Sequence, residues 1–207
     1  MLGRLAFRLF SMPASFFHLD RNTDVTILRL RSKDGTNRLT RQCVRALLAV
    51  FQEVQSEEQA LVISGNENFF SVGADLGEIA GLNGPQAYEF STMGQQLMLA
   101  VDQFPAPVFA AVSGYCMGGG LDLALACHRR IAAPNAVFGH RGAALGLITG
   151  WGGTHRLPRL VGKAVARQMF VAAEKVRAFR ALEIGLIEAI ADDPIAAALV
   201  QIRERRT

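Results

Sequence analysis

The sequence has few of the residues that define several other classes of protein. Its 207 residues include only three cysteines, Cys43, Cys116 and Cys127, and no CxxC pair. This usage does not fit a disulfide framework or a structural zinc site, and it favours a reduced, cytoplasmic setting. No uninterrupted run of about 18 apolar residues is present, so we expect no membrane-spanning helix.

Charge is also sparse. Charged residues make up 19% of the chain, and 22 basic against 18 acidic residues give a net charge of +4. The charges bunch only at 203–206, so we expect no nucleic-acid-binding surface. Half of the residues are hydrophobic, which excludes wholesale disorder.

The N-terminus differs from the remainder. The first nineteen residues lack acids and carry Arg4 and Arg8 among apolar and serine residues. We expect an N-terminal extension over 1–15, and a targeting segment stays open as an alternative. A single core domain over 16–190 and a C-terminal helix over 191–207 account for the rest, as the usual ~100–200 residues per domain allow.

Strand and helix signals alternate along the chain. Residues 25–30 are rich in β-formers and could form a hairpin with 16–19, and Thr40 can cap a helix. Further short apolar runs predict strands at 60–63, 108–112 and 131–133. Helices are expected after Gly73, from Pro85, over 121–127 and from Pro194. The alternation predicts an α/β fold with parallel pairing.

Two glycine-bearing segments stand at the ends of predicted strands. They are FSVGADL at 70–76 and VSGYCMGGGLDLA at 112–124, and each leads into a predicted helix. The first N–H groups of a helix have no partner within it, so two converging helix starts can place two donors on one oxygen. Such a pair is an oxyanion hole. Close packing of helix on strand is the alternative use of the glycines. A phosphate cradle is less fitting, because neither GxxxxGK[ST] nor a strand-linked GxGxxG is present.

With these two segments, the sequence resembles the enoyl-CoA hydratase/isomerase (crotonase) superfamily. The matching segments follow in family order: 70–76, 107–127, FGH at 138–140, LGLI at 145–148, GWGGTHRLPRLVGK at 150–163 and ALEIGL at 181–186. The resemblance implies a crotonase-like spiral of ββα units with a short helical C-terminal part. It also implies a homotrimer or hexamer.

The resemblance further implies an acyl-CoA substrate. Its thioester oxygen would lie between the backbone N–H groups of Ala74 and Gly119. Coenzyme A would enter as part of the substrate, with no permanently bound cofactor and no metal. The CoA path would follow four residues, Ser71, Val72, Ala74 and Leu76. Arg38 falls where the family approaches the nucleotide, and a guanidinium suits phosphate; an exposed surface arginine is the equal alternative.

The acid–base groups depart from the family pattern. Family hydratases use two carboxylates, and the first matches Asp122, which reaches about 1.5 Å less far than a glutamate. A helix-start charge is the alternative role of Asp122. The second position is Gly142, which cannot transfer a proton. Its neighbour His140 can act as acid or base and is a weaker catalytic candidate beside a plain structural role.

These departures favour one type of chemistry over another. A single base suffices for a double-bond shift, and enolate stabilisation suffices for some decarboxylations. We therefore expect an isomerase- or decarboxylase-like enzyme more than an efficient hydratase. A non-catalytic acyl-thioester-binding paralogue and an enzyme for carrier-protein thioesters are the alternatives. Few residues follow the last family motif, so the site should be more open. By the resemblance, Trp151 replaces a small residue in the glycine-rich loop that borders the acyl pocket in the family, so we expect it either to narrow the pocket or only to pack.

Overall fold

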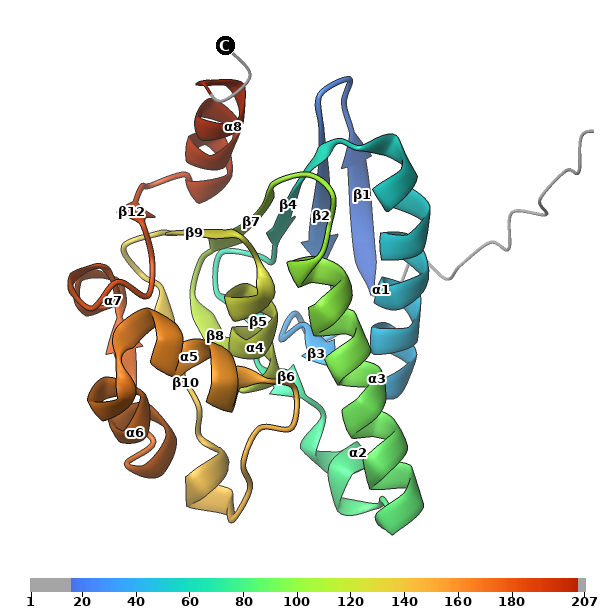
Figure 1. Ribbon diagram of the computed structural model, residues 1–207, viewed down its shortest axis with the longest axis vertical. Coiled ribbons are helices and arrows are strands. Elements are labelled where there is room, and N and C mark those ends of the chain that lie inside the picture. The colour runs from blue at the N-terminus through green and yellow to red at the C-terminus, as the bar shows by residue number, and fades with distance from the viewer. Residues whose placement is uncertain (1–15, 205–207) are drawn as a thin grey trace, which may run out of the picture.

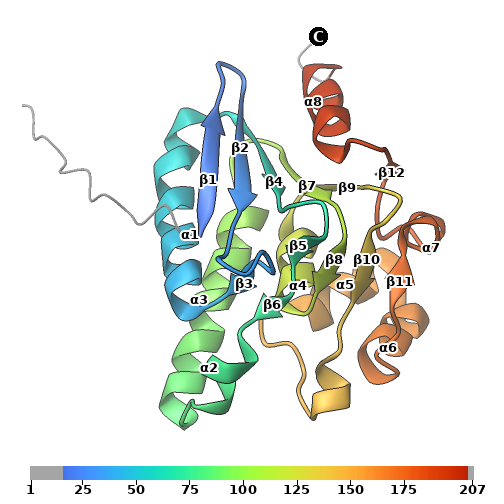
Figure 2. The ribbon, with the colours of Figure 1, turned by 180° about the vertical axis from the view of Figure 1, so that it is seen from behind.

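A six-stranded sheet runs through the molecule (Figures 1 and 2). The computed structural model describes residues 16–204. The strand order is β1-β2-β4-β7-β9-β12, in which β1 pairs antiparallel with β2 and every other pair is parallel. The strands are β1 (Phe17–Arg21), β2 (Val25–Leu30), β4 (Ala60–Ser64), β7 (Val108–Val112), β9 (Arg129–Ala132) and β12 (Ala189–Ile190).

Both faces of the sheet are buried at its central strands, which explains the nearly continuous apolar runs of these strands. On β4, Leu61 and Ile63 point into the main core, whereas Ala60 and Val62 point into a second, smaller core. The smaller core is closed by α8 (Pro194–Glu204), which contributes Ala198 and Ile202 and contacts β4, β7 and β9. The short C-terminal helix therefore covers one face of the sheet.

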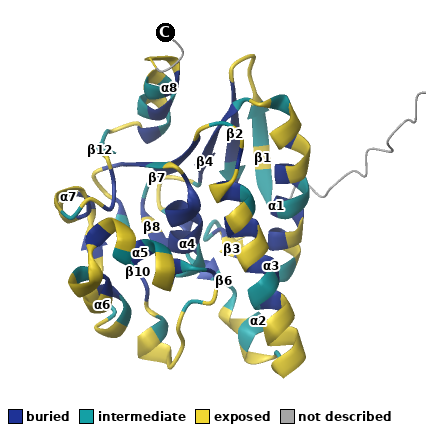
Figure 3. Cartoon of the chain, in the orientation of Figure 1, coloured by how far each residue is buried: buried dark blue, intermediate teal, exposed yellow. Residues whose placement is uncertain are grey.

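The opposite face carries the helices of the main core. α1 (Arg41–Val54) and α3 (Gly84–Asp102) lie side by side there, and α4 (Gly119–Ala126) packs against α3 (Figures 1 and 3). Thr40 caps α1 by accepting a hydrogen bond from the Cys43 N–H, as its position in the sequence predicts. The remaining helices are α2 (Leu76–Ala80), α5 (Gly153–Val161), α6 (Lys163–Val171) and α7 (Ala178–Glu183), with 3₁₀ turns at Gln55–Glu57 and Gly142–Leu145.

A second sheet of four strands lies beside the first (Figure 2). Its order is β11-β10-β8-β5, and a separate parallel pair joins β3 to β6. Three consecutive chain segments, β4–β5, β7–β8 and β9–β10, each give one strand to each sheet, and α4 completes the unit that begins at β7. These short strands are β3 (Arg38–Leu39), β5 (Phe69–Ser71), β6 (Gly73–Ala74), β8 (Tyr115–Met117), β10 (Val137–Gly139) and β11 (Val176–Arg177).

The α/β class and the main strands are confirmed, and the second sheet supplies the second strand of the ββα units that the family resemblance implies. The hairpin pairs Phe17 with Leu30, and the helices begin close to their predicted caps. β5, β8 and β10 lie in segments for which the local sequence signals predict no strand. The predicted extension over 1–15 lies outside the described residues. Within residues 16–204, no helix is long and apolar enough to cross a membrane, and no three metal-binding side chains cluster.

Candidate functional site

The two glycine-bearing segments come into direct backbone contact. Gly73, at φ +88°, lies so close to the start of α4 that a Cβ on it would be 2.6 Å from the Gly119 nitrogen. A Cβ on Gly120 would be 2.5 Å from the Ser71 carbonyl oxygen. Such distances exclude any side chain at either position. The glycines therefore do serve close packing, and this packing brings the two segments together.

Two backbone amides lie at this contact. Gly119 is the first residue of α4, so its N–H has no partner within the helix. The preceding Gly118 has φ +53° and ψ −124°, a conformation that glycine adopts without strain. A Cβ built on Gly119 would be 3.4 Å from the Ala74 nitrogen. Ala74 and Gly119 both line the same cavity, so two helix-start segments converge on one space.

This cavity has a volume of about 620 Å³ and a mostly apolar wall. One side is formed by α2 and α3, and the other by the segment from His140 to Trp151. Leu76, Leu145 and Ile148 are exposed at its edge, with 53%, 57% and 73% of their surface accessible, so the cavity is open to solvent. The lining residues are Val72, Ala74, Leu76, Ile79, Leu82, Ala87, Phe90, Ser91, Met117, Gly118, Gly119, Asp122, His140, Arg141, Gly142, Ala144, Leu145, Leu147, Ile148, Thr149, Gly150 and Trp151.

A buried carboxylate faces the cavity one helical turn beyond Gly119. Asp122 is 1% exposed, and three-residue spacing places it on the same side of α4 as Gly119. The Thr149 hydroxyl donates a hydrogen bond to Asp122 Oδ2. His140 Nε2 lies 3.2 Å from Asp122 Oδ1, an ion-pair distance, although neither atom has a well-aligned hydrogen bond among the described residues. The cavity therefore holds a carboxylate and an imidazole side by side.

An indole ring closes the cavity beside the Gly119 amide. Trp151 is 5% exposed and packs edge-to-face on Phe90, with ring centroids 5.2 Å apart. A Cβ on Gly119 would be 2.5 Å from Trp151 Cζ3, and one on Gly94 would be 2.0 Å from its Nε1. The ring is thus held between α3 and α4. Both sequence-based alternatives for Trp151 apply, because it packs and also forms part of the wall.

The cysteine thiols do not supply a reactive group. Burial raises the pKa of Cys43 and of Cys127 to about 12. Burial, with smaller effects of Cys127 and Asp122, raises the pKa of Cys116 well above its ordinary value. All three side chains are buried and reduced. A thiolate nucleophile at neutral pH is therefore excluded for these residues.

Comparison with known proteins matches residues 20–204 to the family model described as enoyl-CoA hydratase/isomerase. The chain belongs to the enoyl-CoA hydratase/isomerase family. It is 37% identical over 180 residues to YngF of Bacillus subtilis (strain 168), which carries the name of an enoyl-CoA hydratase/isomerase. That match covers 86% of this chain and 69% of YngF.

Solved structures agree with this assignment. The fold matches DspI of Pseudomonas aeruginosa with a TM-score of 0.87 and 33% identity, over 91% of this chain and 73% of that one. An enoyl-CoA hydratase from Bacillus anthracis gives a TM-score of 0.86 and 32% identity, over 91% and 75%. The architecture is therefore the crotonase fold that the sequence predicts.

In this enoyl-CoA hydratase/isomerase family member, Gly142 leaves no room for a second carboxylate. It begins the 3₁₀ turn at the cavity wall, and a Cβ on it would be 2.6 Å from the Leu147 carbonyl oxygen. A side chain there would require the loop to move. The sequence lacks the second carboxylate at this position, and the local backbone also leaves no space for its side chain.

The residues predicted for the CoA path separate into two groups. Val72, Ala74 and Leu76 line the cavity, but Ser71 is fully buried, and its hydroxyl donates to the Asn37 carbonyl and accepts from the Gly73 N–H. Ser71 thus lies behind the cavity wall, where its two hydrogen bonds fix the local backbone.

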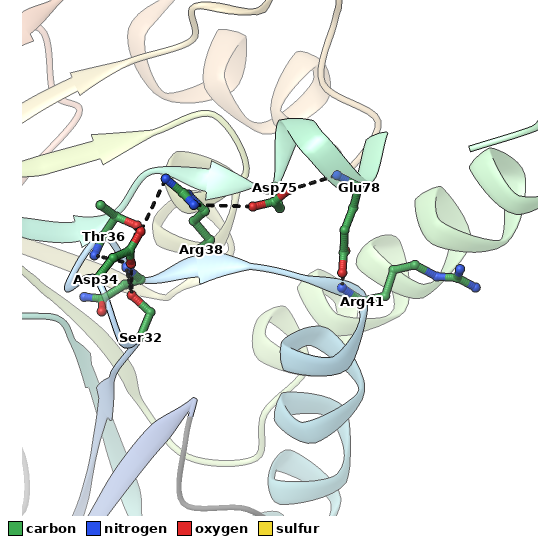
Figure 4. Close-up of polar contacts among 8 residues, drawn as sticks. Ser32, Asp34, Thr36, Arg38, Arg41, Asp75 and Glu78 are labelled. Atoms are coloured by element: carbon green, nitrogen blue, oxygen red, sulfur yellow. Dashed lines mark hydrogen bonds and ion pairs between the residues drawn. The ribbon is translucent and has the colours of Figure 1, made fainter. Parts of the chain in front are cut away.

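Arg38 lies on β3 rather than in the cavity wall. Figure 4 shows its guanidinium between Asp34 and Asp75. The nearest nitrogen–oxygen distances are 3.3 Å to Asp34 and 3.6 Å to Asp75. Hydrogen bonds from Ser32 and Thr36 lower the pKa of Asp34 to about 2, so this carboxylate is ionised at neutral pH. Two acidic partners therefore compete with any phosphate for the guanidinium.

Sequence reasoning missed two residues of the site. Thr149 holds the Asp122 carboxylate, and Gly153 lies so close that a Cβ on it would be 2.0 Å from Asp122 Oδ1. Both precede or begin α5, 27 residues or more along the chain from Asp122. The glycines of the 150–163 motif were a signal for such a close approach, but the sequence does not name the partner.

Proposed function

We propose that this chain is an enzyme for acyl-CoA thioesters that forms an enolate at the α-carbon. The Ala74 and Gly119 N–H groups would stabilise the enolate oxygen, and Asp122 would move the proton. The observation that carries the proposal is the backbone contact between Gly73 and Gly119, which brings two strand-end segments and a buried carboxylate to one cavity. An oxyanion donor of this type contributes ~2.7–4 kcal/mol to catalysis.

The arrangement supports a double-bond shift or a decarboxylation more than efficient hydration. Hydration needs one group to activate water and another to protonate the α-carbon. Here the second position is Gly142, and His140 lies in contact distance of Asp122 rather than across a water molecule from it. One base that removes a proton and returns it elsewhere is sufficient for isomerisation.

Solvent-deuterium exchange at the α-carbon of butyryl-CoA tests the proposal. The enzyme should exchange the α-protons, because enolate formation is reversible. Exchange is followed by mass spectrometry, with binding measured in parallel by calorimetry. Tight binding without exchange would favour the non-catalytic paralogue, and no binding at millimolar concentration would overturn the acyl-CoA proposal.

A carrier-protein thioester is the second candidate, and the surroundings of Arg38 favour it. Asp34 and Asp75 already occupy the guanidinium that would meet the nucleotide phosphate. Acetoacetyl-CoA and acetoacetyl-pantetheine share the thioester but differ in the nucleotide. Equal affinity for the two would support the carrier-protein substrate, whereas much tighter binding of the CoA ester would support free CoA.

We also propose that the chain assembles as a homotrimer or hexamer. Apolar side chains at the end of α6 and on α7 support assembly, since Val171 and Phe179 are 72% and 68% exposed. Light scattering gives the mass in solution. A monomeric mass at micromolar concentration would contradict this part of the proposal.

A further inference from the structure

The imidazole next to Asp122 has a task beyond filling the core. We propose that His140 is the positioning residue of Asp122, orienting its carboxylate by an Nε2–H···Oδ1 hydrogen bond during proton transfer. This inference rests on the proposed function. It names the group that orients the carboxylate of Asp122, whose side chain is shorter than that of a glutamate. Asp122 touches the substrate, and His140 acts through Asp122.

The surroundings of Asp122 call for such a partner. A buried carboxylate is costly unless other groups compensate its charge. Thr149 supplies one neutral hydrogen bond to Oδ2. Across residues 16–204, His140 is the side chain within ion-pair distance of the carboxylate, and no lysine or arginine lies that close. The helix start adds a partial positive charge but fixes no rotamer.

The imidazole is itself held in place from the other side. His140 follows β10 directly, and its side chain is 5% exposed. Its ring lies at 5.0 Å from the Phe170 ring of α6, with a tilt of 41°. Gly153 closes over the pair, since a Cβ there would be 2.0 Å from Asp122 Oδ1 and 3.1 Å from His140 Nε2. His140 thus has little freedom other than rotation of its ring.

That rotation is the small step that the structure leaves open. Oδ1 and Nε2 are 3.2 Å apart, which is within hydrogen-bond reach, yet their alignment is poor. Catalytic hydrogen bonds are often misaligned before the substrate binds and tighten in the complex. A modest turn of the imidazole therefore gives Asp122 Oδ1 the donor that it lacks.

The proton balance needs no additional reactant. In the transfer step the Cα–H bond breaks, its electron pair moves toward the thioester oxygen, and the proton goes to the Asp122 carboxylate. If a solvent deuteron replaces this proton on the carboxyl group before the α-carbon is reprotonated, the result is exchange. In a β,γ-unsaturated thioester, delivery of the proton to the γ-carbon gives a double-bond shift. His140 keeps its own protons throughout and stabilises the carboxylate in the orientation that accepts and returns the proton.

Two substitutions at one position test the role of His140. His140→Leu introduces an apolar side chain of similar size and removes the donor, and we expect α-proton exchange at saturating butyryl-CoA to fall about 10²-fold. His140→Gln restores a side-chain N–H donor, and we expect it to stay within about tenfold of the parent. Half-saturating concentration should be unchanged in both, because binding uses the backbone amides. His155→Leu, the same change at an exposed histidine of α5, is the matched control.

The outcomes separate this inference from the proposed function. Exchange by His140→Leu at the rate of the control would overturn the positioning role while leaving the proposed function intact. An equal loss in the Leu and Gln variants, with unchanged melting temperatures, would also overturn it, because the donor would then not matter. Absence of exchange in the parent protein overturns both together.

Discussion

Substitution of Gly119 by alanine tests two roles of this glycine: its close packing against Trp151, and the proposed donation of its N–H to the thioester oxygen. The new Cβ would lie 2.5 Å from Trp151 Cζ3 and 2.7 Å from its Cε3. Carbon atoms in contact are ordinarily 3.5–4.0 Å apart, so the overlap is about 1 Å. The indole cannot withdraw freely, because it is buried against Phe90 and Gly94. Either the ring or the start of α4 must move.

Both movements have a measurable consequence. Overpacking typically costs about 1–3 kcal/mol of folding free energy, which for a chain of this size lowers Tm by ~2–4 °C per kcal/mol. A shift of the Gly119 amide away from the oxyanion position should reduce α-proton exchange about 10²–10³-fold. Exchange with butyryl-CoA and thermal melting measure the two effects. The double variant Gly119→Ala/Trp151→Leu should show a coupling energy of about 1 kcal/mol or more, because it removes the clash.

Gly84 provides the matched control. It begins α3, and a Cβ on it would have no atom within 4 Å, so Gly84→Ala should leave exchange and Tm close to the parent values. If Gly119→Ala also matches the parent in both assays, the close packing at Gly119 is irrelevant to catalysis and the reasoning is refuted.

Four further outcomes follow from the same geometry. Asp122→Asn should lower exchange about 10²–10⁴-fold while calorimetric binding persists, and unchanged exchange would reduce the carboxylate to a helix-end charge. Hydration of crotonyl-CoA, followed by loss of the enoyl absorbance, should be slow in the parent and in Gly142→Glu, whose Cβ would be 2.6 Å from the Leu147 oxygen; rapid hydration by either contradicts this. Trp151→Leu should improve octanoyl-CoA binding relative to butyryl-CoA binding by roughly tenfold, since the smaller side chain enlarges the cavity. An unchanged ratio of the two affinities in calorimetry would show that the ring does not limit chain length. Arg130 is 4% exposed, and its guanidinium contacts two backbone carbonyls and the Glu188 carboxylate. Arg130→Ala should therefore lower the free energy of unfolding in urea by roughly 3 kcal/mol, and a loss below about 0.5 kcal/mol would count against a structural role.

The parts of the fold that were predictable carry local signals. Thr40 lies directly before an apolar helical pattern, and the apolar run at 60–63 is long enough to indicate the buried strand that the structure has at Ala60–Ser64. The second sheet lacked such signals. Tyr115–Met117 is three residues long, and its partners, Phe69–Ser71 and Val137–Gly139, lie far away in sequence. Pairing over that separation depends on the tertiary fold rather than on local preference.

The candidate site divides in the same way. Gly119 and Asp122 stand three residues apart on one helix, so their common side of the cavity follows from helical geometry. Ala74 could be assigned to the same site only because the segment 70–76 resembles the corresponding family motif. The contacts of Asp122 with Thr149 and His140 depend instead on how α4, β10 and the approach to α5 pack. No spacing in the sequence encodes them, and for this reason His140 was only the weaker candidate.

The most direct test of the account is a crystal structure of the protein with bound butyryl-CoA. The account predicts that the thioester oxygen lies about 2.7–3.1 Å from both the Ala74 and the Gly119 nitrogens, with the α-carbon facing Asp122. A thioester bound elsewhere, or one whose oxygen contacts neither amide, would contradict the central claim.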